Sequence, residues 1–404
     1  MTDFSTTKPK LRLVDTQTVS YEGEKYLLLR DPLMLTDTTL LVPQPMIPAL
    51  AMCDGTRTPE TIRATLALRF GLFLTTERIN EFLRTLDDAL MLENERSYQA
   101  RLAARLEFEQ AEYRPPASAG LSYPDDPQRL SELLQGYIEA LDGDARPLPG
   151  RVRGIISPHI DYERGGPVYA QVWSRAAHSV QEADLAIIFG TDHFSEGYPF
   201  SLTRQNYATP FGVLPTERKI VDELAAVIGE KAAFAGELHH RREHSIELAA
   251  VWMHHIRGGR PISLVPILTG SLDSSGQQMS GPDLEALLTV LRRGMAGRRA
   301  IVIAAGDLAH VGPAFDGSPV DPGGLIMLKN ADDELIQAMC QGDADRFSGA
   351  IQRVQDRNNV CGVSPIYLTL RLLAPSQGAS QGYAVCPADT AQTSVVTICG
   401  VTLQ

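Results

Sequence analysis

The sequence predicts an α/β protein with a mainly parallel sheet flanked by helices, preceded by a small α+β domain. After residue 150, short and nearly continuous apolar runs alternate with segments of helical period, which is typical of parallel strands covered on both faces. The first hundred residues instead show a few alternating strands followed by helical spacing. Between the two parts, RPPASAGLSYPDD at 114–126 has the Pro, Gly and Ser content of a domain boundary.

Composition excludes several classes of protein. The 404 residues include 44% hydrophobic residues and carry a net charge of −12, so no basic face is available and we expect no nucleic-acid partner. No stretch approaches the roughly 18 apolar residues of a membrane span, and the N-terminus lacks the apolar segment of a signal peptide. We therefore expect a cytoplasmic protein without membrane contact. The five cysteines are widely spaced, which argues against a disulfide framework or a zinc ribbon.

Residues 1–98 are predicted to form a winged-helix-like module. The stretch 18–43 alternates apolar and polar residues and predicts two or three short strands. Thr58 followed by Pro59 marks the start of a helix, and 75–92 repeats apolar residues at helical spacing. A charged helical linker is expected at 99–118, and the α/β domain at 119–404.

The run from Leu50 through Cys53-Asp54-Gly55 to Thr58, continued by Phe70-Gly71 and Phe82-Leu83, resembles the PqqD-like peptide-recognition domain. This resemblance implies a peptide or protein partner, such as a radical S-adenosylmethionine (radical-SAM) enzyme, and no chemistry in the module itself. A plain helical adaptor that only packs on the next domain is the alternative interpretation.

In the second part, a helix at 127–141 is followed by alternating elements. Strands are predicted at 151–157, 184–191, 262–270 and 298–307, and helices at 219–230 and 282–295. Three strands run into polar clusters that contain histidine: His159 after the first, Asp192-His193 after the second, and Asp307 with His310 after the last. Because the carboxyl ends of parallel strands line the ligand crevice of such sheets, we expect these side chains to converge.

Other candidates carry weaker signals. Cys361 is expected at a helix N-terminus, where the dipole favours a thiolate that is a nucleophile or a metal ligand, whereas the other four cysteines are expected to be buried and structural. Glu243-His244 begins another predicted helix and either borders the site or forms a solvated first turn. His239, His240, His254 and His255 are expected mostly at the surface. Markers of ATPases, nicotinamide enzymes, zincins and α/β-hydrolases are absent from the sequence.

The second part resembles the Memo family, whose bacterial members include protein B of the AmmeMemoRadiSam system. The resemblance covers roughly 113–404, and its most specific stretches are IISPHIDYERGG at 155–166, IIFGTDHF at 187–194, EHSIEL at 243–248, AAGDLAHVGPAF at 304–315 and NNVCGVSPIYLTL at 358–370. That family shares its fold with the class III extradiol dioxygenases, which hold Fe(II) with two histidines and a carboxylate.

The resemblance implies a metal site of His159, His193 and Cys361, with His310 as acid/base, Asp307 beside it and His244 bordering the pocket. Ile160, Asp161, Asp192 and Phe194 depart from the family pattern, and the two aspartates would make the site richer in oxygen. Iron is the expected metal, with copper or zinc as alternatives.

We hypothesise a metal-dependent redox or dioxygenase-like enzyme acting on a small molecule or peptide. The alternatives are a non-catalytic adaptor that recruits its partner through the N-terminal domain, and a hydrolase that uses metal-activated water.

Overall fold

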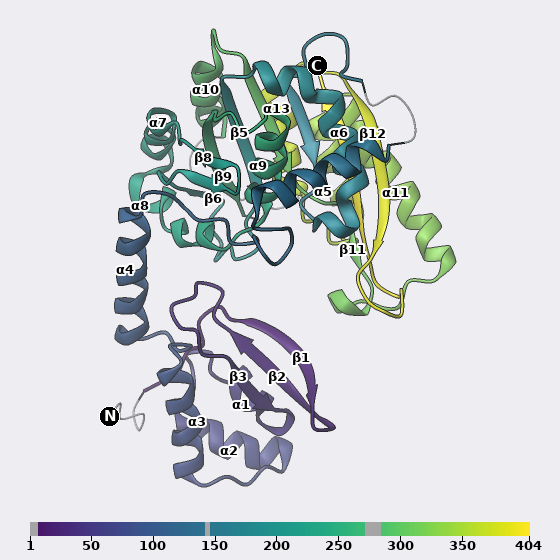
Figure 1. Ribbon diagram of the computed structural model, residues 1–404. Helices are drawn as coiled ribbons and strands as arrows, with labels where there is room; N and C mark the ends of the chain where they lie inside the picture. Colours follow the sequence, from purple (N-terminus) through teal and green to yellow (C-terminus); the bar gives the residue numbers. More distant parts are fainter. Residues whose placement is uncertain (1–6, 142–145, 271–283) are drawn as a thin grey trace. The chain divides into compact units, whose positions relative to one another are not determined.

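The computed structural model describes residues 7–141, 146–270 and 284–404, and its contacts divide the chain into two units (Figure 1). The first unit comprises residues 1–110 and the second residues 111–404. Each has its own hydrophobic core.

In the described residues, the first unit combines a small antiparallel sheet with four α-helices. Strands β1 (Asp15–Tyr21), β2 (Glu24–Arg30) and β3 (Leu40–Pro43) pair in that order. The helices are α1 (Ile47–Ala51), α2 (Pro59–Phe70), α3 (Thr76–Asp88) and α4 (Glu95–Gln110). The Thr58 side chain caps α2 by accepting a hydrogen bond from the Thr61 N–H, as the sequence predicted. The apolar faces of α2 and α3 form the core with β2 and β3, through residues including Leu29, Val42, Ile62, Leu66, Ile79, Leu83 and Leu86.

The sheet of the second unit places the predicted strands side by side. In the described residues it has eight strands, seven of them in the order β11-β13-β4-β10-β5-β9-β6, with β12 paired to β13. Strands β4 (Gly154–Ser157), β10 (Ala300–Ala305), β5 (Leu185–Thr191) and β9 (Ser263–Thr269) are parallel. Strands β6 (Phe200–Leu202), β13 (Val395–Leu403), β12 (Gly378–Pro387) and β11 (His310–Val311) run antiparallel to their neighbours. A short hairpin of β7 (Tyr207–Thr209) and β8 (Gly212–Leu214) stands apart from this sheet.

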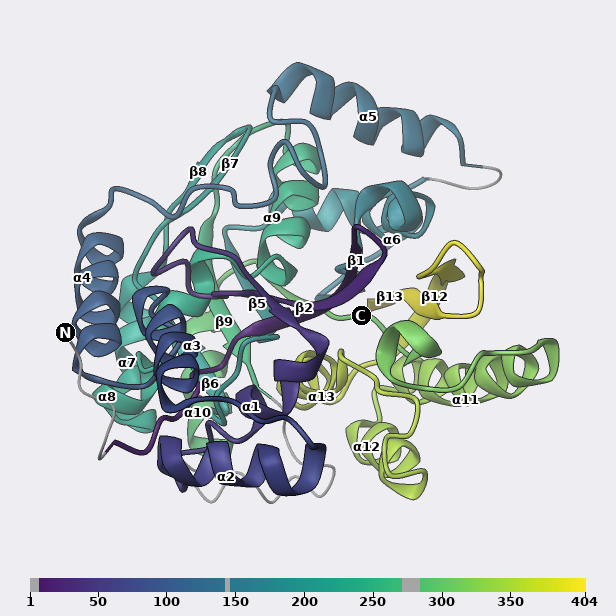
Figure 2. The ribbon, with the colours of Figure 1, turned by 90° about the horizontal axis from the view of Figure 1, so that it is seen from below.

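Helices cover both faces of this sheet. One face packs against α5 (Pro127–Glu139), α6 (Tyr162–Glu182) and α9 (Ser245–Ile256). The other packs against α7 (Arg218–Ile228), α8 (Glu230–Ala233), α10 (Leu284–Met295), α11 (Pro322–Cys340), α12 (Ala344–Arg353) and α13 (Val363–Leu373). Figure 2 shows α5, α6 and α9 on the opposite side of the strands from α12 and α13. The predicted α/β fold with a mostly parallel, helix-flanked sheet is therefore confirmed.

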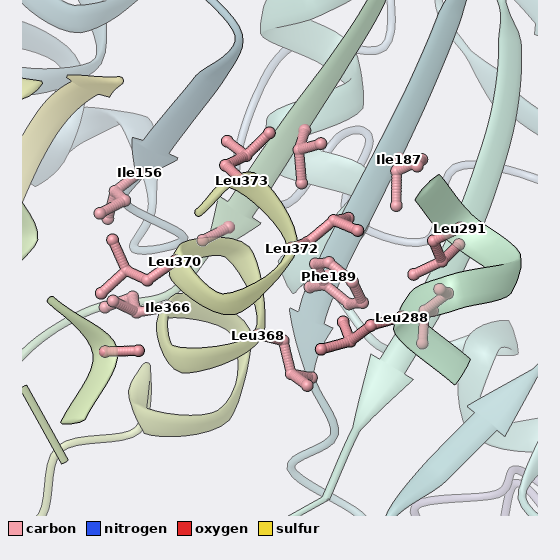
Figure 3. Packing of buried hydrophobic residues seen from close by; sticks show 14 of the residues in the cluster. Ile156, Ile187, Phe189, Leu288, Leu291, Ile366, Leu368, Leu370, Leu372 and Leu373 are labelled. Atoms are coloured by element: carbon pink, nitrogen blue, oxygen red, sulfur yellow. The ribbon is translucent and has the colours of Figure 1, made fainter. Parts of the chain in front are cut away.

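Successive residues of the central strands alternate between the two cores. Ile187 and Phe189 of β5 face α10 and α13, whereas Ile188 between them belongs to the core on the other face. Figure 3 shows residues of α10 and α13 packed on the first of these faces: Leu288, Leu291, Ile366, Leu368, Leu370, Leu372 and Leu373. Because both faces are apolar, the central strands themselves carry few polar side chains, and polar residues follow where these strands end.

The bounds predicted for one helix and for the linker can be compared with the structure. Of the helix expected at 282–295, residues 282 and 283 lie outside the described residues, and the helix is present from Leu284. In the linker expected at 99–118, residues up to Gln110 belong to α4, and Arg114 is fully buried in the second unit. None of the helices in the described residues combines the length and apolarity needed to span a membrane.

Candidate metal centre

Three adjacent parallel strands carry the first group of site residues. The order β4-β10-β5 places Pro158-His159, Gly306-Asp307 and Asp192-His193 at the carboxyl ends of neighbouring strands. The Gly306 N–H donates to the Ser157 carbonyl at 3.0 Å, so the chain stays paired beyond the end of β10. The convergence that the sequence predicted is present, because the imidazoles of His159 and His193 lie 5.0 Å apart between ring centroids.

The buried His159 is fixed by one hydrogen bond from its ring and one from its backbone N–H. Its Nδ1 lies 3.0 Å from the Ala305 carbonyl oxygen, which can only accept, so Nδ1 carries the proton and donates it. Its backbone N–H donates to Asp307 Oδ1 at 2.8 Å. Nε2 therefore points at the Cys361 sulfur, 3.2 Å away, with its lone pair available when His159 is neutral.

His193 is held by a buried carboxylate. Glu243 is fully buried and accepts from the His193 backbone N–H at 3.0 Å and from His193 Nδ1 at 3.0 Å. The Ser245 N–H donates to the same carboxylate at 2.9 Å. Burial opposes the charge on Glu243, but His193 and His244 outweigh it and keep the pKa of this carboxyl well below its usual range. An ionised Glu243 thus directs His193 Nε2 toward the site.

Close backbone packing brings Cys361 to the same place. A Cβ on Gly306 would lie 2.6 Å from the Gly362 Cα, and a Cβ on Gly362 would lie 2.5 Å from the Asp307 carbonyl oxygen. Only glycine permits this approach, which lets the Gly362 N–H donate to the Asp307 carbonyl at 2.9 Å. Cys361 precedes α13 by two residues, where the sequence predicted it.

The thiol and the imidazoles favour each other's charged forms. Burial alone would raise the pKa of the Cys361 thiol, but the charge and hydrogen bond of His159 outweigh burial and lower this pKa to about 6. Burial would lower the pKa of His159, yet the thiolate and Asp307 raise it to about 9. The metal-free site is therefore a thiolate–imidazolium pair, and the thiolate is the form that binds metal ions.

Three groups of side chains in the described residues bring ligand atoms within 4.8 Å of one another. The first is the predicted set of His159, His193 and Cys361; the other two are His193–Glu243–His244 and Asp307–His310–Cys361. In the second group Glu243 is already occupied by N–H donors, including His193 Nδ1 and the Ser245 N–H. We therefore interpret Glu243 as an orienting group and the first and third groups as the ones with free ligand atoms.

These groups open into a pocket of about 540 Å³, a volume that suits a small molecule. His159, His193, His244, Asp307 and His310 line it. Its walls are completed by apolar residues, including Leu121, Leu248, Phe315 and Val396, and by Arg164 and Arg242. The histidines and Asp307 that the sequence singled out thus line one cavity. Cys361 lies next to this cavity and contacts His159.

One wall of the pocket depends on residues that sequence reasoning missed. Arg114 and Glu247 form an ion pair in which both side chains are fully buried. Arg114 also donates to the His240 and Glu243 carbonyls, and Glu247 accepts from the Ser118 N–H at 2.8 Å and from the Tyr123 hydroxyl. Segment 114–123 is thereby tied to α9 and supplies Ala117, Ser118, Leu121 and Ser122 to the pocket. The only signal was Glu247 in the EHSIEL stretch.

The structure corrects the expectation for the paired histidines. His239, His240 and His254 are buried, and only His255 is partly exposed. His239 Nδ1 lies 2.8 Å from Asp192 Oδ2, and His240 Nε2 lies 2.8 Å from the Ser201 carbonyl oxygen. Polar neighbours in the sequence suggested a surface loop, but each imidazole finds a buried partner that is distant in sequence.

Asp161 and Asp192, the two aspartates that depart from the family pattern, form their hydrogen bonds with residues other than His159, His193 and Cys361. Asp161 caps α6 by accepting from the Arg164 N–H at 3.0 Å, and it pairs with the Arg164 guanidinium. Asp192 accepts from the Phe194 N–H at 3.1 Å and contacts His239. Asp192 therefore supports the loop that carries His193.

Comparison with known proteins agrees with this architecture. The family model described as Memo-like protein matches residues 114–400. A MEMO1 family protein of Aquifex aeolicus is 26% identical over 345 residues, which cover 84% of this chain and 87% of that protein. One from Methanosarcina mazei is 30% identical over 256 residues, 63% of this chain and 84% of that protein. The protein memo-1 homolog of Caenorhabditis elegans is 28% identical over 262 residues, 63% of this chain and 69% of that protein.

The family match begins at the buried Arg114 and contains all of the pocket residues named above. The N-terminal resemblance to PqqD-like domains lies outside it and stays a prediction. Because the matched residues make up well over half of the chain, this protein belongs to the Memo-like family.

Proposed function

We propose that this protein binds a transition-metal ion, iron or copper, through His159, His193 and Cys361 and uses it in redox chemistry on a small molecule or peptide. The main observation in support is that these three ligand atoms lie within 4.8 Å of one another, beside a pocket of about 540 Å³. Each histidine has its Nδ1 engaged by an acceptor, which leaves Nε2 for the ion.

The donor set supports this choice of metal. Two imidazoles and one thiolate suit iron, copper and zinc better than magnesium or calcium. Three protein ligands leave coordination positions open toward the pocket, which is typical of catalytic rather than structural sites. When bound, an iron or copper ion would supply one-electron chemistry at these open positions. Uptake of a cation would also release the proton that His159 shares with Cys361.

The surrounding residues have separate tasks in this proposal. His310 Nδ1 lies 3.2 Å from the Leu308 carbonyl oxygen, so it donates there and leaves Nε2 to exchange a proton with substrate in the pocket. Asp307 holds the His159 backbone through Oδ1. His244 stacks on His193 at 5.0 Å between ring centroids and borders the substrate space. Leu121 and Phe315 supply apolar surface to the walls of the pocket.

Metal analysis of the full chain tests the proposal. Protein purified without oxygen and loaded with Fe²⁺ should retain the ion through gel filtration, whereas His193→Ala should lose most of it. His178→Ala is the matched control, because His178 is exposed on α6 and its ion pair in the described part of the chain is with Glu182. Equal iron content in wild type and His193→Ala would overturn the assignment. Oxygen uptake by the loaded protein separates redox chemistry from hydrolysis by a zinc-activated water.

A second candidate function is an adaptor that recruits a protein partner, such as a radical-SAM enzyme, through the N-terminal unit. The observation that favours it is a unit with its own core whose α2 end exposes Leu68, Phe70 and Phe73. In co-purification with such an enzyme, the adaptor function requires that His193→Ala retains the partner and that the double variant Leu68→Ser/Phe73→Ser loses it. If instead His193→Ala loses the partner and the double variant retains it, the metal site and not the N-terminal unit is responsible for partner binding.

A further inference from the structure

The group of Asp307, His310 and Cys361 has ligand atoms within 4.8 Å of one another, as the first group does. Cys361 belongs to both groups, so the two sets of ligands meet at its sulfur. The residues come from two segments that glycine packing holds together, the strand end after β10 and the turn before α13. This arrangement places two sets of three donors side by side with one shared atom.

Each donor of the second set has a free ligand atom. The Nδ1 proton of His310 goes to the Leu308 carbonyl at 3.2 Å, so Nε2 is the open nitrogen, as in His159. Asp307 uses Oδ1 to accept from the His159 N–H, and among the described residues its Oδ2 has the looser contact of 3.8 Å with His159 Nε2. A thiolate sulfur has more than one lone pair and can bind two cations.

We propose that the protein holds a second metal ion at Asp307, His310 and Cys361, with the Cys361 thiolate bridging the two ions. The proposal rests on the proposed function, because the bridging thiolate is also a ligand of the first ion. Two ions that share one ligand atom lie about 3.5–4 Å apart in known two-metal sites, a separation compatible with two sets of donors that each span 4.8 Å.

The charges near Cys361 support two cations. The Asp307 carboxylate lines the pocket, and the Glu243 carboxylate and the Cys361 sulfur each contact a histidine that lines it, so three acidic groups lie close together. Asp307 holds the His159 backbone through Oδ1, which leaves Oδ2 to contact a cation in the second position.

The two positions differ in ligand chemistry and access. The first has two nitrogens and a sulfur, whereas the second has an oxygen, a nitrogen and a sulfur. The carboxylate makes the second position more favourable for harder ions such as Fe²⁺, Co²⁺ or Zn²⁺ than for Cu⁺. Asp307 and His310 both line the pocket, so the second ion can enter from solvent and contact a bound molecule. Its binding occupies His310 Nε2, and the one-ion and two-ion states would therefore differ in acid–base capacity.

Titration of the full-length, metal-free protein with Co²⁺ alone tests the inference. Bound cobalt is measured after gel filtration, together with the thiolate-to-cobalt absorption and the electron paramagnetic resonance signal per ion. Wild type and the surface control His178→Ala should bind two equivalents, and exchange coupling through the bridging sulfur should weaken the resonance signal on addition of the second. His310→Ala should bind one equivalent and keep an uncoupled signal. His310→Asn should also bind one equivalent. Tryptophan fluorescence of both variants shows whether they are folded, so that loss of the second ion is not mistaken for a structural defect.

The outcomes separate this inference from the proposed function. One equivalent in wild type, or two in both His310 variants, overturns the second position. If His193→Ala binds as much cobalt as wild type while the His310 variants lose one equivalent, the first position is wrong and the second stands. If none of the proteins retains cobalt, both assignments are wrong.

Discussion

The Glu243 carboxylate accepts two hydrogen bonds from one residue, His193, through its backbone N–H and through its imidazole Nδ1, each at 3.0 Å. Glu243 is fully buried, whereas the His193 side chain retains 32% of its exposure toward the pocket. The carboxylate therefore fixes the position, the tautomer and the basicity of the imidazole at once. Such carboxylate–histidine pairs commonly orient metal ligands.

Replacing Glu243 by Gln should weaken metal binding without unfolding the protein. The glutamine amide has the same size as the carboxylate and keeps one acceptor oxygen. It removes the negative charge that makes His193 a better ligand, and it accepts the Ser245 N–H hydrogen bond less well than a carboxylate. Loss of such a supporting carboxylate costs roughly 10- to 100-fold in metal affinity. Competition with a chelator measures the dissociation constant. Glu107→Gln, an exposed position on α4, is the control, and an unchanged affinity in Glu243→Gln would contradict the orienting role.

Cys361 should be the most reactive of the five cysteines in the metal-free protein. Its pKa of about 6 makes it mainly thiolate at pH 7.5, whereas burial raises the pKa of Cys53 to about 12 and of Cys386 to about 11. Alkylation by iodoacetamide, followed by mass spectrometry, should therefore modify Cys361 first, with a rate that falls as the pH drops below 6. His159→Ala should move this midpoint upward, and bound metal should protect the thiol. Preferential alkylation of another cysteine would contradict the prediction.

The buried pair of Arg114 and Glu247 should be important for stability. Arg114→Met would leave the Glu247 charge buried without a counterion, a change that costs about 3–5 kcal/mol in other proteins. Both tryptophans, Trp173 and Trp252, lie in the second unit, so their fluorescence during urea unfolding reports on this unit alone. Stability within 1 kcal/mol of wild type would contradict the prediction.

Two further variants refine that measurement. Arg293→Met removes one partner of the exposed pair with Glu223 and should change the unfolding free energy by no more than about 1 kcal/mol. The double variant Arg114→Met/Glu247→Met should be less destabilised than the sum of the two single variants, because it leaves no unpaired buried charge. Additive effects would show that the two side chains stabilise the protein independently.

The convergence at the centre was predictable because it follows from local sequence. Buried parallel strands have nearly continuous apolar runs, so the polar residues after β4, β5 and β10 stand out, and sheet topology brings such strand ends together. Cys361 could be placed before a helix by the same kind of local signal. Its contact with His159, 202 positions away, followed only from the family resemblance.

The remaining parts of the site depend on pairs that no local pattern reports. Arg114 lies beside two prolines and looks like a residue of a linker, yet its partner Glu247 is 133 positions away. His240 lies in a polar run and is buried because the Ser201 carbonyl and the Tyr207 hydroxyl meet its two nitrogens. Burial of a polar side chain depends on where its partner lies in three dimensions, which spacing along the chain does not encode.

Asp332 on α11 is a buried carboxyl outside the metal site. Burial raises its pKa to about 6, although the Tyr383 hydroxyl, which donates at 2.9 Å, and the nearby Lys329 favour the charged form. The neighbouring Asp333 carboxylate acts in the same direction as burial. In the unfolded chain the pKa is about 3.9, so the folded protein binds the proton more tightly. The stability that Asp332 contributes is therefore complete below pH 4 and is lost as the pH rises through 6.

Asp332→Asn should consequently gain stability relative to wild type as the pH rises. The amide is neutral at every pH, whereas wild type must keep a charge in an apolar environment above pH 6, so the difference in unfolding free energy should grow by about 2 kcal/mol between pH 4.5 and 8. Urea unfolding at the two pH values, followed by tryptophan fluorescence, measures it. Asp345→Asn, at an exposed position on α12, should show a difference that hardly depends on pH. A difference for Asp332→Asn that is constant, or that shrinks toward pH 8, would mean that Asp332 is ionised in the folded protein throughout this range, with the Tyr383 hydroxyl and Lys329 outweighing its burial.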